Sequence, residues 1–337
     1  MQKQLKATKK KVRFTPITVF LLVVLCLWCC SLIFLMSWSV ITSFKVNRFV
    51  YEIDPLGFFI DYNRYLNSWS SDPNVEPDVF YRFELLKAQA EGWLPFYTYR
   101  HIFMDFVVTT DPMKGHPPRE VGILEMYGNS ALYSVGCAFT GTLVPYITAY
   151  ACARYKYKFS RFIHTLVLFV MMVPIVGSTP SQMSIANALG LLNNHVGLWI
   201  MSGNFLGLHF LVFYDICKSF PESYSEAAKI DGATNMQVFI HVATPLLINT
   251  FWTVFLLKWV GFWNTYQTAQ LFLPSYPVLA MGLNRIMNSN ADSLRFDHTA
   301  TPARMAAIAM TAIPVCIVFA IFQKRLLGNL TVGGIKG

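Results

Sequence analysis

Residues 162–214, FIHTLVLFVMMVPIVGSTPSQMSIANALGLLNNHVGLWIMSGNFLGLHFLVFY, contain no Asp, Glu, Lys or Arg. A helix that crosses the hydrocarbon core of a membrane needs about 20 consecutive apolar residues. An uncharged stretch of 53 residues is too long for one crossing and predicts two, with a turn between them. Residues that favour turns lie near its middle: Pro174, Gly177, Pro180, Gly190, Asn193 and Asn194.

The rest of the chain has the same apolar character, since 54% of its 337 residues are hydrophobic and 13% are charged. An ordinary soluble domain carries about 25% charged residues. The uncharged stretches predict an all-α polytopic membrane protein with six transmembrane helices, at 17–42, 129–152, 162–182, 196–217, 243–263 and 304–323. The apolar part of the first span exceeds the roughly 7–15 residues of a signal-peptide core, so we expect it to remain as an anchor.

The Lys and Arg residues predict the orientation of these spans, because cytoplasmic loops carry an excess of them. With the N-terminus in the cytoplasm, the inside segments hold 15 Lys and Arg, whereas the outside segments, more than twice as long, hold 11. We therefore expect a multi-pass protein of the cytoplasmic (plasma) membrane with both termini cytoplasmic. The net charge of +9 is then a topology signal and a source of contacts with membrane lipid, and we expect no nucleic-acid partner.

The predicted spans divide the chain into parts with different expected roles. These are a cytoplasmic N-terminus (1–16), the first span (17–42), an extracellular cap loop (43–128), a core (129–323) that contains the cytoplasmic segment 221–241, and a cytoplasmic tail (324–337). The cap loop is too aromatic for a disordered linker and is expected to dock a partner or to form a packed lid. A short helix is expected over 277–287. The seven cysteines lack metal-ligand spacing, so no metal site is predicted.

The cytoplasmic segment between the fourth and fifth spans carries the strongest local signals. Pro221 suits the first turn of a helix, and Glu222 near that start is favoured by the helix dipole. Gly232 accepts the left-handed backbone that commonly ends a helix. Thr234 and Gln237 have the spacing of a capping box, which starts a second helix at once. The segment therefore predicts two short helices joined by a sharp turn at the inner face of the membrane.

The same segment carries a recognisable signature. Small alanines follow Glu226, so another protein can approach this helix closely beside a single carboxylate. The chain has Glu-Ala-Ala at 226–228, Gly232, and Val-Ala-Thr-Pro at 242–245. This stretch resembles the signature of ABC-importer permeases, which is Glu-Ala-Ala, three residues, Gly, nine residues and Ile-x-Leu-Pro. Val and Thr replace the Ile and Leu, whereas the spacing of the glycine and the proline is kept.

Further stretches resemble the carbohydrate-importer permeases, of the type of the smaller (G-type) permease of the maltose importer. These are Asn129-Ser130, residues 149–157, Met172-Val173-Pro174, residues 189–194, Phe262-Trp263-Asn264 and the C-terminal residues 330–337. The resemblance covers about 125–337 well and the first span loosely. The cap loop is longer than is typical of the type.

The resemblance implies a type I ABC-importer permease fold and a set of partners. These are a second permease subunit in a heterodimer, two ATPase subunits that bind ATP and Mg²⁺, an extracellular solute-binding protein, and a carbohydrate substrate. It also implies that 221–241 holds a coupling helix seated on an ATPase, with the coupling residues Glu226, Ala227, Ala228, Asp231 and Gly232. The tail would contact the ATPases through Gly333, Gly334 and Lys336.

Other residues are candidates for contact with the transported solute or with the binding protein. Lys258 lies inside the fifth predicted span. A charged residue there either has a functional role or extends its side chain to the membrane interface. Aromatic and amide neighbours suit stacking on a sugar, or form an interfacial aromatic belt: Trp259, Phe262, Trp263 and Asn264. The resemblance also suggests binding-protein contacts at Tyr266, Tyr276 and Pro277.

The sequence contains no Walker A motif and no catalytic constellation, so we expect a non-catalytic subunit with no cofactor of its own. The expected function is that of a permease subunit that imports a carbohydrate, specifically an oligosaccharide, with ATP hydrolysed by a separate subunit. One alternative is an ABC permease for another solute such as a glycerol phosphate. Another is a secondary transporter or a membrane-embedded enzyme, which would need acidic residues inside the spans.

Overall fold

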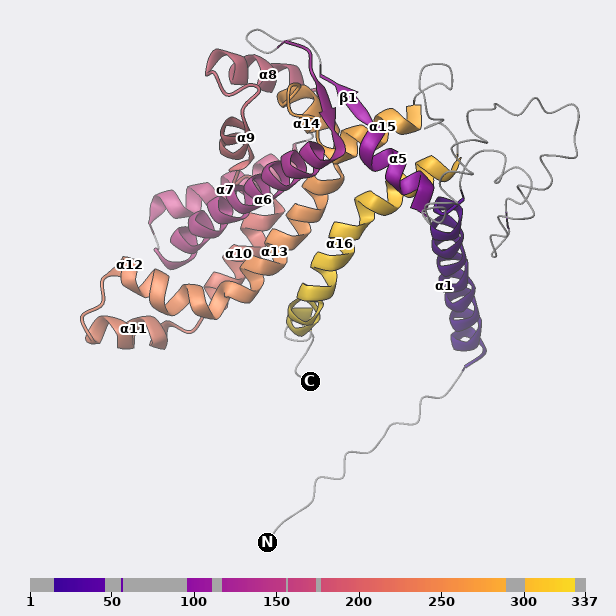
Figure 1. Cartoon of the computed structure of the whole chain (residues 1–337). Coiled ribbons are helices and arrows are strands. Elements are labelled where there is room, and N and C mark those ends of the chain that lie inside the picture. The colour runs from indigo at the N-terminus through magenta and orange to yellow at the C-terminus, as the bar shows by residue number, and fades with distance from the viewer. Residues whose placement is uncertain are drawn as a thin grey trace, which may run out of the picture. The chain divides into compact units, whose positions relative to one another are not determined.

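The computed structural model describes residues 15–45, 56, 96–110, 117–155, 157–173, 177–288 and 301–330, with side chains of the last helix to Gln323. The chain divides into two compact units, residues 1–98 with 300–306, and residues 99–299 with 307–337. Figure 1 shows their elements, and each unit is considered by itself. Most of the predicted cap loop 43–128 lies outside the described residues, as do the first 14 residues and the end of the predicted tail.

The first unit contains α1 (Pro16–Ser43), whose sequence explains both its start and its length. The Thr15 hydroxyl accepts a hydrogen bond from the Thr18 N–H (3.3 Å), and Pro16 takes the first helical position. Apolar side chains cover all sides of the helix, and most of them are exposed. Its 28 residues give a length of about 42 Å. This is long and apolar enough to cross a membrane.

The second unit is built around α6 (Ile123–Arg154), against which α9 (His195–Ser202), α10 (Leu208–Ser219) and α13 (Thr244–Asn264) pack. Many of the residues that α6 buries are small: Ser130, Ser134, Cys137, Ala138, Gly141, Thr142 and Ala149. Small side chains let helix backbones approach closely, which is how helices associate where lipid replaces water. The hydroxyls need no outside partner where they donate to the helix itself, as Thr142 does to the Ala138 carbonyl (2.7 Å).

The other described helices and strands complete the fold. They are α5 (Tyr97–Asp105), β1 (Val107–Thr109), β2 (Glu120–Gly122), α7 (Lys158–Met172), α8 (Thr179–Ala188), α11 (Glu222–Ile230), α12 (Asn235–Gln237), the π-helix η2 (Val238–Ala243), α14 (Gln267–Phe272), α15 (Leu279–Asn288) and α16 (Thr301–Leu330). Strands β1 and β2 pair antiparallel, with Val108 opposite Val121, and both of these side chains are buried.

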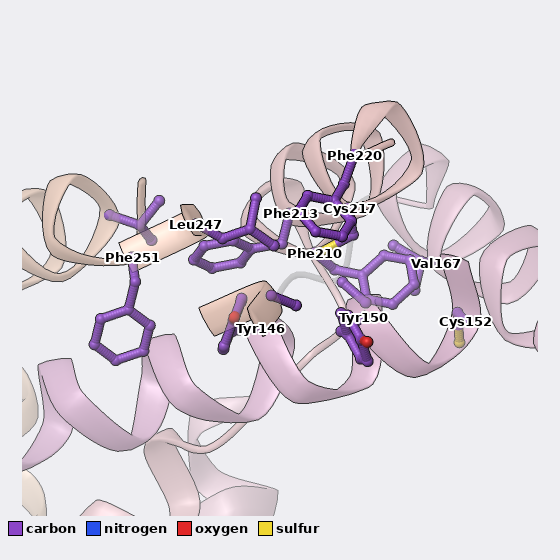
Figure 2. Close-up of a cluster of buried hydrophobic side chains, with 13 residues drawn as sticks. Tyr146, Tyr150, Cys152, Val167, Phe210, Phe213, Cys217, Phe220, Leu247 and Phe251 are labelled. Carbon is purple, nitrogen blue, oxygen red and sulfur yellow. The ribbon is translucent and has the colours of Figure 1, made fainter. Parts of the chain in front are cut away.

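A cluster of aromatic side chains joins α6 to α10 and α13 (Figure 2). The Tyr146 ring lies at its centre, with ring centroids 5.3 Å from Phe213 and 5.7 Å from Phe251, both edge-on. The Tyr146 hydroxyl is 3.0 Å from the hydroxyl of Thr244 at the start of α13. Edge-on aromatic pairs add to the free energy gained from burial alone. The cluster therefore holds the ends of three helices together beside the segment that contains α11.

The predicted spans compare with the helices as follows. Four described helices are long and apolar enough to cross a membrane: Pro16–Ser43, Ile123–Arg154, Asn235–Asn264 and Thr301–Gln323. They contain the predicted spans 17–42, 129–152, 243–263 and 304–323. The expected helix over 277–287 is found as α15, shifted by one or two residues.

The two predicted spans inside the opening stretch are not continuous helices. In place of 162–182, α7 ends at Met172 and α8 begins at Thr179, after Gly177 with φ +77°. In place of 196–217, α9 and α10 are separated by residues 203–207, Gly-Asn-Phe-Leu-Gly. Glycine at both ends of this break lowers the helix propensity. Hydropathy stays high across the break, so a hydropathy pattern does not detect it. The last helix also runs on to Leu330, seven residues beyond the predicted end.

One close approach offers a test of this packing. The Trp199 indole of α9 lies directly against Gly136 of α6 and donates to the Leu132 carbonyl (3.1 Å). In Gly136→Ala the added methyl group overlaps the indole ring, so we expect a loss of about 1–3 kcal/mol in the free energy of unfolding. Gly128→Ala, in the same helix with open space around the added carbon, should cost nothing. Thermal unfolding of the two purified variants makes the comparison, and equal stability would contradict the described packing.

Candidate functional site

The turn after α11 is a complete Schellman motif. Gly232 has φ +83°, in the left-handed region that a side chain disfavours. Its N–H donates to the Lys229 carbonyl (3.0 Å), and the Ala233 N–H donates to the Ala228 carbonyl (2.9 Å). The expected sharp glycine turn is therefore confirmed. Pro221 is the N-cap residue, and α11 begins one residue later, at Glu222.

The second half of the segment begins with the expected capping box. The Thr234 hydroxyl accepts from the Gln237 N–H, and the Gln237 side chain accepts from the Thr234 N–H (2.8 Å). From Asn235 the chain is helical without a break to Asn264, through α12, η2 and α13. Pro245 lies just after η2; a proline has no N–H to donate and its ring crowds the preceding turn. The wider π turn accommodates this. The exposed segment is thus continuous with a membrane-crossing helix.

Helix α11 lies at the surface, and none of its nine described residues is buried. One of its faces lines a cavity of about 220 Å³, together with the end of α6. The lining residues are Tyr150, Arg154, Tyr155, Glu222, Ser225, Glu226, Lys229, Asn235 and Val238. Glu226 therefore points along the side of α11 that faces α6, and its side chain remains exposed. Ala227 is exposed, whereas Ala228 is half-buried.

The sequence did not single out the apolar residues that this segment exposes. The Ile230 side chain is 86% exposed, and Met236 and Tyr224 are 66% and 53% exposed. Large apolar side chains that a mostly polar segment exposes mark a surface available for contact with another molecule. The available signal was an isoleucine between Lys229 and Asp231, in a segment otherwise rich in small and polar residues.

Arg154 ties the start of this segment to α6. Its Nη2 donates to the Phe220 carbonyl (2.6 Å), and its guanidinium lies 4.7 Å from the centre of the Phe220 ring. Both contacts strengthen when they are shielded from water. The segment is therefore held at both ends, by Arg154 before α11 and by the continuous helix after α12. No local sequence signal identifies this pair, because 66 residues separate its members.

Lys258 of α13 faces α6 at the break between α9 and α10. A carbon added at Gly141 of α6 would lie 3.3 Å from the Lys258 Nζ and 3.1 Å from the Ser202 carbonyl. Ser202 ends α9, and the C-terminal end of a helix carries partial negative charge. No carboxylate pairs with Lys258 among the described residues. The helix end therefore provides a compensating field for this half-buried ammonium group.

The structure divides the other candidate pathway residues into two groups. Phe262 lies one turn beyond Lys258, with its ring edge-on to Tyr133 of α6 at 5.7 Å. Trp259 and Trp263 lie on another side of α13 and are buried. The Trp263 Nε1 donates to the Thr311 carbonyl of α16 (3.1 Å), and the centre of the Trp259 ring lies 5.4 Å from that of the Trp263 ring. Asn264 is exposed and donates to the carbonyl of Val260, one turn back (2.9 Å).

The candidates for binding-protein contact lie near the opposite end of α13 from α11. Tyr266 packs on a second apolar cluster, and Pro277 is buried, with its carbonyl accepting from Asn129 (3.2 Å). Tyr276 is half-buried, with its ring 5.1 Å from that of His195. The tail candidates Gly333, Gly334 and Lys336 lie outside the described residues. Within the described ranges no three His, Cys, Asp or Glu side chains gather to hold a metal ion.

Taken together, the fold and the site define a multi-pass membrane subunit with an exposed helical segment at one end of its bundle. The chain belongs to the family of binding-protein-dependent transport system inner membrane components, whose model matches residues 141–330. It is therefore an ABC transporter permease, a membrane transport subunit. The stretch at 226–245 that carries the resemblance lies inside the matched region.

Individual relatives agree with this family. The chain is 28% identical to the melibiose/raffinose/stachyose import permease MelC of Bacillus subtilis, over 57% of this chain and 68% of that protein. It is 30% identical to the sulfoquinovosyl glycerol permease SmoH of Agrobacterium fabrum, over 58% and 67%. It is 31% identical to the maltose/maltodextrin permease MalG of Vibrio vulnificus, over 56% and 64%.

A solved structure supports the fold. The chain superposes on one from a bacterial ABC transporter that imports the acidic polysaccharide alginate, with a TM-score of 0.66. The match covers 93% of this chain and 99% of the other, at 21% sequence identity. The expected type I importer fold is confirmed by this likeness and by the family.

The turn at Gly232 can be tested by itself. Nothing lies within 4 Å of a carbon added at Gly232 or at Gly261, but Gly232 alone of these two has a positive φ. Gly232→Ala should therefore weaken the end of α11 by about 1 kcal/mol, which speeds hydrogen exchange of its amides about fivefold. Gly261→Ala should leave this exchange unchanged. Equal exchange in the two variants would contradict a left-handed turn.

Proposed function

We propose that this permease imports an oligosaccharide across the cytoplasmic membrane, driven by ATPase subunits that dock on α11. The observation that carries the docking is the exposed segment 222–237, with its apolar Ile230 and Met236 and its continuous connection to α13. The substrates of the relatives support the substrate class, since melibiose, raffinose and stachyose are oligosaccharides and maltodextrins are glucose oligomers.

The proposed assembly has this chain paired with a second, different permease, above two ATPase subunits that bind ATP and Mg²⁺. An extracellular binding protein delivers the substrate to the face that contains Tyr276. Both termini of this chain lie in the cytoplasm, on the side of α11, because the excess of Lys and Arg favours that side. This chain holds no cofactor and performs no chemical step.

The geometry suggests how ATPase movement reaches the pathway. An ATPase that contacts Ile230 and Ala227 and pairs a basic residue with Glu226 would move α11 as a rigid body when it changes conformation. The Schellman turn and the capping box leave few free torsions between α11 and α12. Because Asn235–Asn264 is one continuous helix, the displacement tilts α13 against α6. Lys258 and Phe262, which face α6, then move relative to the break in α9 and α10.

The role of Glu226 can be tested by charge removal and reversal. Glu226→Gln should lower oligosaccharide-stimulated ATP hydrolysis of the assembled transporter about tenfold, because a charge-assisted hydrogen bond across the interface is lost. Glu226→Arg should also prevent copurification of the ATPase. Asp215→Asn removes an exposed carboxylate from α10, outside the segment, and should leave both measurements unchanged.

The same assay distinguishes docking from substrate class. Unimpaired copurification and ATP hydrolysis in Glu226→Arg would refute the coupling role. The wild-type transporter with its binding protein tests the substrate class. The oligosaccharide proposal is refuted if its ATP hydrolysis is stimulated by a glycerol phosphate and not by melibiose, raffinose or maltodextrin. In that case the docking result would still stand.

The apolar part of the docking surface has its own test. Ile230→Asp should abolish copurification of the ATPase, because a carboxylate placed in the interface loses its water without gaining a partner. The chain should remain folded, since the Ile230 side chain is 86% exposed. Leu189→Asp replaces another aliphatic side chain, 65% exposed at the residue that follows α8, and should copurify normally. Normal copurification of Ile230→Asp would place the docking surface elsewhere.

A further inference from the structure

A second cavity lies beside the one under α11, where the end of α6 meets the start of α7 and the end of α10. It has a volume of about 410 Å³ and shares Arg154 and Glu222 with its neighbour. Its lining residues are Cys152, Ala153, Arg154, Tyr157, Ser160, Arg161, His164, Tyr214, Lys218 and Glu222. The coupling proposal does not use this cavity.

The cavity carries more positive than negative charge. Arg154, Arg161 and Lys218 contribute three cationic groups, against the single carboxylate of Glu222. The Lys218 Nζ lies 5.9 Å from the centre of the Tyr214 ring, which holds the ammonium group over the cavity wall. Each cation comes from a different helix, and the packing of α10 beside α6 and α7 brings Lys218 to the two arginines, which are close in the sequence.

Two of these cations are accessible to a ligand. Arg161 and Lys218 have exposed side chains, whereas Arg154 is half-buried and already bonded to the Phe220 carbonyl. Hydroxyls of Tyr157, Ser160 and Tyr214 surround them. The Ser160 hydroxyl already donates to the Tyr155 carbonyl (2.6 Å), and its oxygen can still accept. Guanidinium and ammonium groups among hydroxyls are the chemistry that binds phosphate.

The surface next to the cavity is apolar. Helix α7 exposes large side chains close to Arg161, with Phe159 68% and Phe162 59% exposed. Further along the same helix Phe169 is 62% exposed. A cationic cavity at the end of a helix that exposes an apolar surface matches a molecule with an anionic head and hydrocarbon chains. Inorganic phosphate would use only the cationic part.

We propose that this cavity binds the phosphate of an anionic phospholipid in the cytoplasmic leaflet, with Arg161 and Lys218 as its accessible ligands. The assignment of the leaflet rests on the proposed function, since α11 lies on the ATPase side. Basic pockets between membrane helices on the cytoplasmic side recognise anionic head groups in this way. Glu222 disfavours a bare anion, but its carboxylate can accept hydrogen bonds from the hydroxyls of a glycerol head group.

The location gives the lipid a structural consequence. A head group held by Arg161 and Lys218 would join α7 to α10, beside the Arg154 that anchors the start of α11. Bound lipid would therefore stabilise the contact between the end of α6 and the start of the exposed segment 222–237. The apolar face of α7 would accommodate the acyl chains without any change in the fold.

The test measures lipid retention by the complete transporter complex, purified in detergent and stripped of lipid. Phosphatidylglycerol and phosphatidylcholine with identical acyl chains are titrated separately, and bound lipid is counted by native mass spectrometry. Phosphatidylglycerol should bind at least about tenfold more tightly. The double variant Arg161→Gln/Lys218→Gln should lose about tenfold of that affinity, because each basic residue near an anionic lipid contributes several-fold.

Control variants make the outcome decisive. Lys158→Gln removes an exposed cation from the start of α7 that does not line the cavity, so it should retain wild-type affinity. Lys218→Arg keeps the charge and should bind as well. Equal affinity for the two lipids, or wild-type affinity in the double variant, would overturn the proposal. Competition by millimolar inorganic phosphate without any preference for lipid would show a site for a soluble anion instead.

The lipid measurement is independent of ATPase coupling. Lipid counts in Glu226→Gln should equal those of the wild type, because Glu226 does not line this cavity. If Glu226→Arg loses coupling, as expected, but the wild type shows no preference for the anionic lipid, only the lipid site is refuted. If the lipid preference is present while Glu226→Arg has no effect, the coupling role alone is refuted.

Discussion

Helix α6 packs against α9, α10 and α13 at once because it faces them with small side chains. Gly136 accommodates the Trp199 indole, and Gly141 accommodates the Lys258 side chain and the end of α9. Larger side chains at these positions would push the three helices apart. Farther along α6 the contact is aromatic, because the Tyr146 ring packs against Phe213 of α10 and Phe251 of α13 (Figure 2). Close approach at one end and aromatic packing at the other fix the directions of the neighbouring helices, and every candidate site depends on those directions.

The packing of α6 also positions the exposed segment 222–237. Arg154 is the last residue of α6, and its contact with Phe220 sets where α11 begins. The Tyr146 hydroxyl contacts Thr244, where η2 passes into α13. The segment is thus anchored to α6 on both sides while its own helix stays exposed. The proposed coupling role needs both properties, an exposed surface and fixed ends. The same anchoring brings Arg154, Arg161 and Lys218 together in the neighbouring cavity.

The sequence predicted local features well and distant ones poorly. The Gly232 turn and the capping box of Thr234 and Gln237 follow from backbone chemistry within a few residues, and both are confirmed. The membrane character follows from composition. The end of α7 at Met172 and the break at 203–207 were missed, because hydropathy does not register the interruption of a helix in an apolar stretch. Trp259 and Trp263 were grouped with Lys258 by their proximity in sequence, whereas they are buried on another side of α13, where Trp263 bonds to α16.

The sequence by itself determined that this chain crosses a membrane several times and carries, at 226–245, a stretch that resembles the signature of importer permeases. These properties depend on hydropathy, charge distribution and spacing, which are linear in the chain. Only the tertiary structure decided which side of α13 carries Lys258, which face of α11 carries Glu226, and which cations share a cavity. Those relations join residues that are far apart in the sequence, such as Arg154 and Phe220, 66 positions apart, and Gly141 and Lys258. They exist only once the small residues of α6 have allowed its neighbours to pack.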